Sequence, residues 1–273
     1  MRAVIDREPY SLVSSCLYGA MCRATVTNRL MALTVGSLFS GIGGLDLGLE
    51  RAGMKVIWQA EIDLYCNKVL KKHWPEVPNH GNIKDIKWGT VERPNVICGG
   101  YPCQPFSTAG KRHGTDDPRH LWPWVRTAIS ELRPDYAILE NVPGHLTLGG
   151  TAVIGDLAKI GYDAEWRVIS AAGLGAPHKR NRLIIVAYPN GCKLGYFNNS
   201  RSNTATNDKW PKIFVANSSS RSTSGTNSHW TLEPNVGRVA NGVSDRVDKL
   251  KGLGNAVVPQ VAEYVGHLIV NAQ

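Results

Sequence analysis

The chain has 273 residues, which is enough for one or two domains with a full hydrophobic core. Its hydrophobic content of 42% and charged content of 19% are those of a folded protein, and no apolar run is long enough to predict a membrane span. The formal net charge of +9 favours a polyanionic partner such as nucleic acid, because neutralised phosphates release condensed counterions. A merely basic surface is the alternative interpretation of this charge.

Six cysteines are present and none forms a Cys-x-x-Cys pair. This content is too thin for a small fold held by disulfides, so we predict a protein of the reducing cytoplasm. No group of His and Cys has the spacing of a zinc site, and we therefore predict no metal.

Residues 1–32 show no clear hydrophobic period and precede a strong strand-and-turn pattern. Arg23 and Arg29 interrupt their most apolar stretch, which argues against a signal peptide. These residues form either a disordered arm or sequence upstream of a start at Met31, and both interpretations stay open.

From Leu33 onward, short apolar runs alternate with segments of helical spacing. Strands are predicted over residues 34–39, 55–60, 96–98, 136–139, 165–171 and 182–188. Helices are predicted over residues 45–52, 64–73, 122–132, 151–160 and 259–270, with a shorter periodic stretch at 246–250. This order predicts an α/β fold with a doubly wound, mostly parallel sheet covered by helices on both faces.

The composition changes after Pro189, where residues 190–235 become rich in Asn, Ser, Thr and Gly. This region is either a small loop-rich second domain or a disordered linker. We expect residues 33–189 to form the main domain and residues 236–273 to pack back on it.

Two motifs follow predicted strands. The first, residues 39–44, reads Phe-Ser-Gly-Ile-Gly-Gly, and its glycines permit close approach of a ligand to the backbone. Glu61, at the end of the second strand, can accept hydrogen bonds from ribose hydroxyls. The second motif, Gly-Tyr-Pro-Cys-Gln-Pro-Phe-Ser at residues 100–107, holds Cys103 in a loop stiffened by prolines. Such a loop beyond a strand end faces the ligand side of a doubly wound sheet.

Three further motifs follow in the chain. Glu140-Asn141-Val142 ends a strand, where partial desolvation would raise the pKa of the carboxyl and make it a proton donor. Arg180 and Arg182 share one face of an extended segment and suit phosphate or carbonyl oxygens. Gly-Leu-Gly-Asn-Ala-Val-Val-Pro at residues 252–259 predicts a glycine turn before a helix start close to a ligand.

Each motif alone has an ordinary structural explanation, such as a tight turn, a helix cap or a solvated basic edge. In this order and spacing the five together resemble the DNA (cytosine-5)-methyltransferase family, over residues 33–190 and 236–272. The resemblance implies a Rossmann-like methyltransferase fold, S-adenosylmethionine as cofactor and double-stranded DNA as substrate. It also implies that residues 190–235 form a short target-recognition region.

The resemblance assigns roles to single residues. Cys103 matches the nucleophile that attacks C6 of a flipped cytosine, Glu140 the residue that protonates N3, and Arg182 the residue that contacts O2, with Arg180 in support. The implied cofactor contacts are Phe39, Gly41, Gly43, Glu61, Ile62, Asn82, Ile83, Pro102, Leu121 and Asn255. The implied DNA contacts are Gln104, Ser107, Lys111 and Arg112, in a mobile loop that closes over the substrate.

The chain departs from the family pattern at Asn82, where an Asp is usual, and at His178, where a Gln is usual. The Thr-Leu signature of the recognition region has at most a faint counterpart at Thr231-Leu232. Two alternatives therefore stay open: a DNA-binding relative with impaired catalysis, and a tRNA cytosine-5 methyltransferase, although the Cys-Phe-Thr signature of the latter is not found. We expect a monomer without membrane contact, paired at most with a restriction endonuclease that acts separately.

Overall fold

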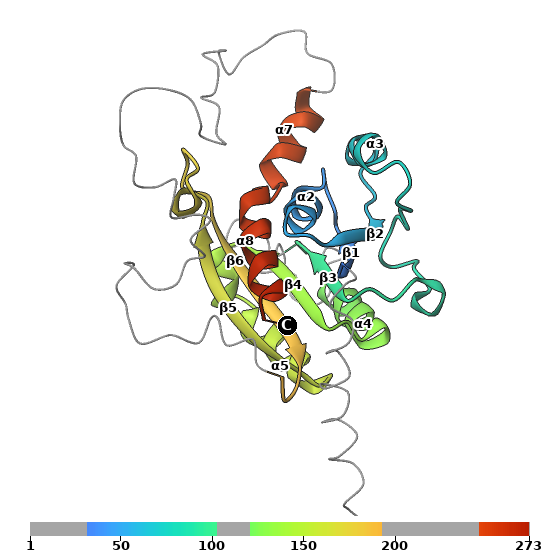
Figure 1. Ribbon diagram of the computed structural model, residues 1–273, viewed down its shortest axis with the longest axis vertical. Helices are drawn as coiled ribbons and strands as arrows, with labels where there is room; N and C mark the ends of the chain where they lie inside the picture. Colours follow the sequence, from blue (N-terminus) through green and yellow to red (C-terminus); the bar gives the residue numbers. More distant parts are fainter. Residues whose placement is uncertain (1–31, 103–120, 193–245, 273) are drawn as a thin grey trace, which may run out of the picture. The chain divides into compact units, whose positions relative to one another are not determined.

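The computed structural model describes residues 32–102, 121–192 and 246–272. Apart from Ala32, these residues belong to one unit, Leu33–Gln273. Six strands of this unit form a sheet in the order β2-β1-β3-β4-β6-β5 (Figure 1). The strands are β1 (Thr34–Leu38), β2 (Lys55–Ala60), β3 (Val96–Gly99), β4 (Tyr136–Asn141), β5 (Tyr162–Ser170) and β6 (Asn181–Pro189).

Helices alternate with the first five strands, as the hydrophobic pattern predicted. The α-helices are α2 (Gly44–Arg51), α3 (Leu64–His73), α4 (Trp122–Leu132), α5 (Gly150–Lys159), α7 (Arg246–Asn255) and α8 (Pro259–Val270). Three short 3-10 helices, at Trp88–Thr90, Pro143–Leu146 and Ala172–Leu174, were not predicted. None of the helices in the described residues has the length and apolar character needed to cross a bilayer.

The predicted α/β fold with a mostly parallel sheet is confirmed. β1 pairs in parallel with β2 and β3, and β3 pairs in parallel with β4. β6 is antiparallel to both β4 and β5, so it runs opposite to its two neighbours in the sheet. The amino end of β6 therefore lies beside the carboxyl end of β4.

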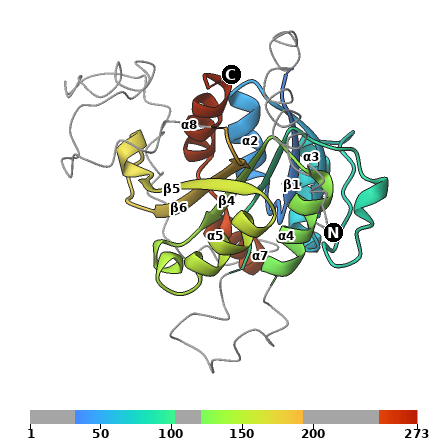
Figure 2. The same cartoon turned by 90° about the horizontal axis from the view of Figure 1, so that it is seen from below.

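Helices cover both faces of the sheet, with α2 and α8 on one side and α4 and α5 on the other (Figures 1 and 2). Each face has its own cluster of buried apolar side chains. The central strands contribute to both clusters; Cys98 packs into one and Ile97 into the other. Burial on both faces explains why these strands are nearly continuous apolar runs.

Small residues let α2 and α8 approach each other closely. A Cβ on Gly48 would lie 2.2 Å from the Pro259 carbonyl oxygen, and one on Gly44 would lie 2.3 Å from the Val257 carbonyl oxygen. Gly44 closes the first glycine motif, whereas Val257 and Pro259 belong to the last motif. The packing of these helices thus brings the two ends of the candidate cofactor site together.

The prediction of a glycine turn at residues 252–254 was wrong, because α7 continues through Asn255. A Cβ on Gly252 would lie 3.1 Å from Cγ2 of Ile42 and 3.6 Å from Cε1 of Tyr65. At this position glycine thus lets α7 approach Ile42 and Tyr65 closely, and it does not form a turn. Residues 1–31 and 193–245, nearly all of the predicted arm and recognition region, lie outside the described residues.

A buried carboxyl group fastens α2 to the sheet. Asp46 Oδ1 accepts a hydrogen bond of 2.5 Å from the Ser37 hydroxyl on β1, and Oδ2 accepts one of 2.7 Å from Nε2 of Gln59 on β2. Burial raises the pKa of Asp46 to about 6, although the two hydrogen bonds oppose this shift. Asp46 was not identified from the sequence, because an acidic residue in a first helical turn usually faces solvent.

Asp46 should make stability depend on pH. The pKa of Asp46 is higher in the folded chain than in the unfolded chain. Its contribution to the free energy of unfolding is therefore fully present below the unfolded pKa and is lost as the pH rises through the folded pKa of about 6. The loss between pH 4 and pH 7 should be about 2 kcal/mol, at ~1.4 kcal/mol for each unit of pKa shift. Asp46→Asn should remove this dependence, as urea unfolding of both proteins at the two pH values would show. Parallel pH profiles for wild type and variant would contradict the assignment.

Candidate active site

The predicted site residues meet at one edge of the sheet because of the strand directions. Parallel strands β1, β2, β3 and β4 all end at this edge, and antiparallel β6 begins there. The edge therefore collects the glycine motif after β1, Glu61 after β2, Gly100 after β3, Glu140 on β4 and Arg182 on β6. In doubly wound sheets this edge is where ligands bind.

Glu140 and Arg182 form an ion pair at the centre of this edge. Arg182 Nε lies 2.7 Å from Glu140 Oε1, and the two side chains are 18% and 10% exposed, respectively. A Cβ on Gly100 would lie 2.7 Å from Glu140 Oε2, so the glycine gives this carboxylate its space. The segment that leads into Cys103 thus runs directly against the Glu140 carboxyl group.

Burial raises the pKa of Glu140 above its ordinary value, and the charges of Arg182 and Arg180 counteract part of this rise. A carboxyl with a raised pKa holds a proton more readily near neutral pH. Arg182 holds Oε1 of this carboxyl group, and Oε2 lies against Gly100.

Tyr101 anchors the beginning of the cysteine loop. Its side chain is buried, its hydroxyl lies 2.8 Å from Nε2 of His145, and its ring packs at 5.4 Å from the ring of Trp122. Its carbonyl oxygen accepts a hydrogen bond of 3.2 Å from Nδ2 of Asn141, the residue after Glu140. These contacts fasten the loop to β4 two residues before Cys103.

Cys103 itself, with Gln104, Ser107, Lys111 and Arg112, lies outside the described residues, and its role stays a prediction. Two other cysteines are poor nucleophiles. Burial and the nearby Glu61 and Asp63 raise the pKa of Cys66 to about 12. Burial and the nearby Asp46 raise the pKa of Cys98 well above its ordinary value.

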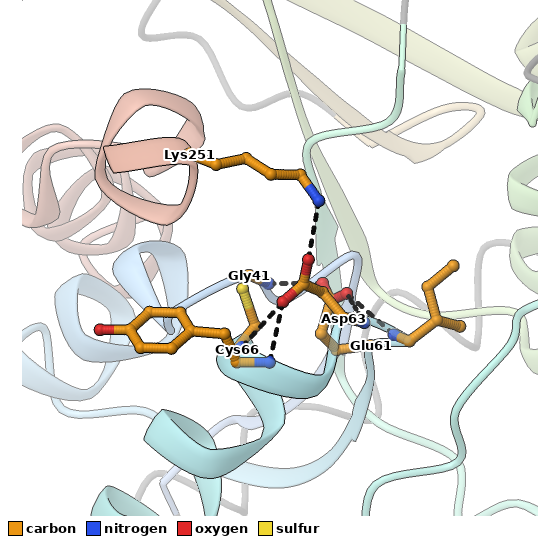
Figure 3. A network of polar contacts seen from close by, with 7 residues as sticks. Gly41, Glu61, Asp63, Cys66 and Lys251 are labelled. Carbon is orange, nitrogen blue, oxygen red and sulfur yellow. Dashed lines mark hydrogen bonds and ion pairs between the residues drawn. The ribbon is translucent and has the colours of Figure 1, made fainter. Parts of the chain in front are cut away.

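The glycine motif and Glu61 form one hydrogen-bonded unit (Figure 3). Glu61 Oε2 accepts a hydrogen bond of 2.8 Å from the Gly41 N–H, and Oε1 accepts bonds from the N–H groups of Ile62 and Asp63. A carboxylate offers about four acceptor positions. Within the described residues three are used, which leaves one for a ribose hydroxyl.

Backbone conformation explains the glycines of this motif. Gly41 and Gly43 have φ angles of 56° and 85°, and even Phe39 has a φ of 52°. A Cβ on Gly43 would lie 2.4 Å from the Trp74 ring, whereas one on Gly41 would have, among the described residues, no closer neighbour than the Phe39 carbonyl oxygen at 3.9 Å. Gly43 is thus required by packing, and Gly41 borders open space where a ligand can approach.

The remaining predicted cofactor residues differ in accessibility. Ile62 is 67% exposed beside Glu61, whereas Ile83 is only 4% exposed and packs in the core. The Asn82 side-chain oxygen accepts a hydrogen bond from the Lys84 N–H and shapes a local turn. Leu121 caps the start of α4, Pro102 is exposed after β3, and Asn255 is the exposed last residue of α7.

Arg180 does not join Arg182 at the Glu140 carboxyl group. Its Nη2 donates hydrogen bonds to the carbonyl oxygens of Gly254, at 2.7 Å, and Ala256, at 2.5 Å. These two residues flank Asn255, so Arg180, directly before β6, holds the backbone around Asn255 in place. Arg180 thus binds backbone carbonyl groups at the end of α7, whereas Arg182 on β6 pairs with Glu140.

Sequence reasoning missed Tyr101, His145, Asp63 and Lys251 as parts of the site. Asp63 could have been identified from the sequence, since an Asp directly before a helical segment predicts an N-cap. It caps α3 by accepting hydrogen bonds from the N–H groups of Tyr65 and Cys66. The Tyr101–His145 contact joins residues 44 positions apart and left no local signal.

Comparison with known proteins supplies the family. A model of the C-5 cytosine-specific DNA methylase family matches residues 33–242. The chain belongs to this family. Among curated members, it is 35% identical to the type II methyltransferase M.BsuFI of Bacillus subtilis, over 59% of this chain and 40% of that protein. It is 29% identical to the type II methyltransferase M.HhaI of Haemophilus parahaemolyticus, over 62% of this chain and 53% of that protein.

The match covers 40% and 53% of these two type II methyltransferases, so the chain spans about half their length or less. Solved structures show the same fold. A DNMT2 mutant of Spodoptera frugiperda matches with a TM-score of 0.53 and 23% identity, over 63% of this chain and 54% of that one. A Dnmt2 methyltransferase of S. pombe matches with a TM-score of 0.51 and 22% identity, over 59% of this chain and 52% of that one.

Proposed function

We propose that the chain transfers a methyl group from S-adenosylmethionine to C5 of cytosine in DNA, through attack by Cys103 on a flipped base. Membership of the cytosine-specific DNA methylase family supports the reaction. The observation that carries the proposal is the ion pair between the buried Glu140 and the partly buried Arg182, set against Gly100, three residues before Cys103. This pair is suited to hold the polar edge of a cytosine ring.

The residues present fit the cofactor. Gly41 borders open space, and the Glu61 carboxylate beside it retains one acceptor position for a ribose hydroxyl. Ile62 offers an exposed apolar surface on which an adenine ring can pack. When bound here, S-adenosylmethionine supplies an electrophilic methyl group on a positively charged sulfur.

Each side chain at this edge of the sheet has a separate role in the reaction of the cytosine. C5 of cytosine is a poor nucleophile until a thiolate adds to C6, and Cys103 provides that thiolate. Glu140 delivers a proton to N3 as C6 is attacked, which limits the negative charge that develops in the ring. Arg182 orients Glu140 and donates a hydrogen bond to O2. Loss of the C5 proton after methyl transfer then releases Cys103.

Cytosine C5 and C6 are inaccessible inside a duplex, so the base must leave the stack. Gln104, Ser107, Lys111 and Arg112 follow Cys103 and supply polar and cationic contacts to the phosphates and the opened duplex. Residues 190–235 provide a short recognition region. We further propose that the chain acts as a monomer and, as for type II methyltransferases, can accompany a separate endonuclease.

The proposal predicts which nucleic acid is methylated. Purified full chain should transfer labelled methyl groups to duplex DNA, with no transfer to tRNA. Bisulfite sequencing of DNA from cells that express the chain should reveal modified cytosines in one sequence context. Labelling of tRNA alone would establish the tRNA alternative, and DNA binding without any transfer would establish an impaired relative.

A further inference from the structure

We propose that the Asp63–Lys251 ion pair is a clamp that holds the end of α7 against the glycine motif and thereby sets the affinity for S-adenosylmethionine. The inference rests on the proposed function, because it concerns the same cofactor site. Asp63 and Lys251 are positioning residues in this inference. They act through Glu61 and through the backbone around Asn255.

The clamp begins at Glu61 and ends on α7 (Figure 3). Glu61 accepts hydrogen bonds from the N–H groups of Gly41 and Asp63, and so joins the glycine motif to the start of α3. Asp63 uses Oδ1 to cap α3 and Oδ2 to bind Lys251 Nζ at 2.8 Å. One continuous set of hydrogen bonds thus runs from the glycine motif to α7, across 210 positions of sequence between Gly41 and Lys251.

Packing and charge support this connection. Gly252, the neighbour of Lys251, has no side chain to separate α7 from Ile42 and Tyr65. The Lys251 hydrogen bond and the cap to Cys66 lower the pKa of Asp63 to about 2, so Asp63 is ionised throughout the physiological range. Lys251 is 61% exposed and Asp63 is 26% exposed, which leaves the pair accessible to screening by salt.

The end of α7 is held from two sides. Arg180, directly before β6, binds the Gly254 and Ala256 carbonyl oxygens, while Asp63, the N-cap of α3, binds Lys251. Asn255, a predicted cofactor contact, lies between these attachments. Arg180 therefore fixes Asn255 relative to the base-binding residues, and the Asp63–Lys251 pair fixes it relative to Glu61. If Lys251 is released, the α7 side of the cofactor site can move away from the glycine motif.

Two substitutions separate the ion pair from the helix cap. Lys251→Met removes the charge and keeps the length of the side chain. Asp63→Asn removes the opposite charge, while its amide oxygen can still cap α3. Calorimetry with the full chain should show that each variant binds S-adenosylmethionine about two- to fivefold more weakly at low salt, the range typical of exposed ion pairs. The double variant should bind no more weakly than either single variant.

Salt, a matched control and steady-state kinetics complete the test. The difference from wild type should disappear near 1 M salt, where the screening length falls to about 3 Å. Lys68→Met, at an exposed lysine on α3 with no ion pair within the described residues, should leave binding unchanged. The two clamp variants should raise KM for S-adenosylmethionine with little change in kcat. Their melting temperatures should show that they fold.

The outcomes distinguish the clamp from the proposed function. Wild-type affinity in a folded Lys251→Met variant would overturn the clamp and leave the methyltransferase proposal intact. Cofactor binding that weakens in the clamp variants, without methyl transfer to DNA by any of the proteins, would support the clamp and overturn the proposed function. A wild-type chain that binds no S-adenosylmethionine would overturn both.

Discussion

Glu140→Gln is expected to slow methyl transfer by about 10²- to 10⁴-fold, the range typical of a lost general acid. The amide has nearly the same shape and can still donate a hydrogen bond to cytosine N3, but it has no proton to transfer. Arg182 would also lose its anionic partner at 2.7 Å. Single-turnover transfer of a labelled methyl group to DNA would measure the loss, and the affinity for S-adenosylmethionine should stay close to that of wild type.

The pH dependence of methyl transfer by wild type should also show that Glu140 acts as a general acid. Because Glu140 acts in its protonated form and burial raises its pKa, activity should persist above the ordinary range of a carboxyl group and then fall as the pH rises through the raised pKa. The attacking thiol has the opposite requirement, since deprotonation activates it. A bell-shaped profile should result, and its alkaline limb should be absent in Glu140→Gln.

Glu165→Gln provides the matched control. Glu165 is another buried carboxyl, in the middle of β5, where it accepts a hydrogen bond of 2.7 Å from the Tyr188 hydroxyl. The same change of carboxyl to amide at Glu165 should leave the rate of methyl transfer within about a factor of two of wild type, since Glu165 lies away from the strand ends that form the active site. Equal losses in both variants would show that Glu140 acts through folding rather than through proton transfer.

Cys103→Ser should reduce methyl transfer by at least about 10⁴-fold, because a hydroxyl is far less ionised than a thiol and adds poorly to C6. The substitution leaves the Tyr101 contacts to His145 and Asn141 in place, so the start of the loop should keep its position. DNA binding and cofactor binding should therefore survive. Transfer at the wild-type rate would contradict the assignment of the nucleophile.

A duplex that contains 5-fluorocytosine makes this test direct. Fluorine at C5 cannot leave as the proton does, so the bond between sulfur and C6 should persist after methyl transfer. Wild type should form a complex with this duplex that resists denaturing electrophoresis, and Cys103→Ser should form none. Cys192→Ser, at a partly exposed cysteine after β6, should be trapped like wild type. Trapping of Cys103→Ser would assign the nucleophile to another side chain.

Local patterns predicted the α/β class and most helices and strands, since periodicity and turn residues report local conformation. They also selected Glu140, Arg182, Glu61 and the glycine motif. They failed at residues 252–254, where α7 continues and Gly252 lies close to Ile42 and Tyr65, a contact that a linear pattern cannot reveal. They also assigned Arg180 to a phosphate or a supporting position without indicating its actual partners, the carbonyl oxygens of Gly254 and Ala256 at the end of α7.

Residue types and their order along the chain were sufficient to predict the family, the layered fold and the chemical groups of the site. Which groups meet was decided by strand direction and helix packing. Because β6 runs antiparallel to β4, Arg182 reaches Glu140, and because small residues let α2, α7 and α8 approach, the last motif reaches the first. Such contacts depend on side chains far apart in sequence, whose proximity arises only when the sheet and its helices assemble.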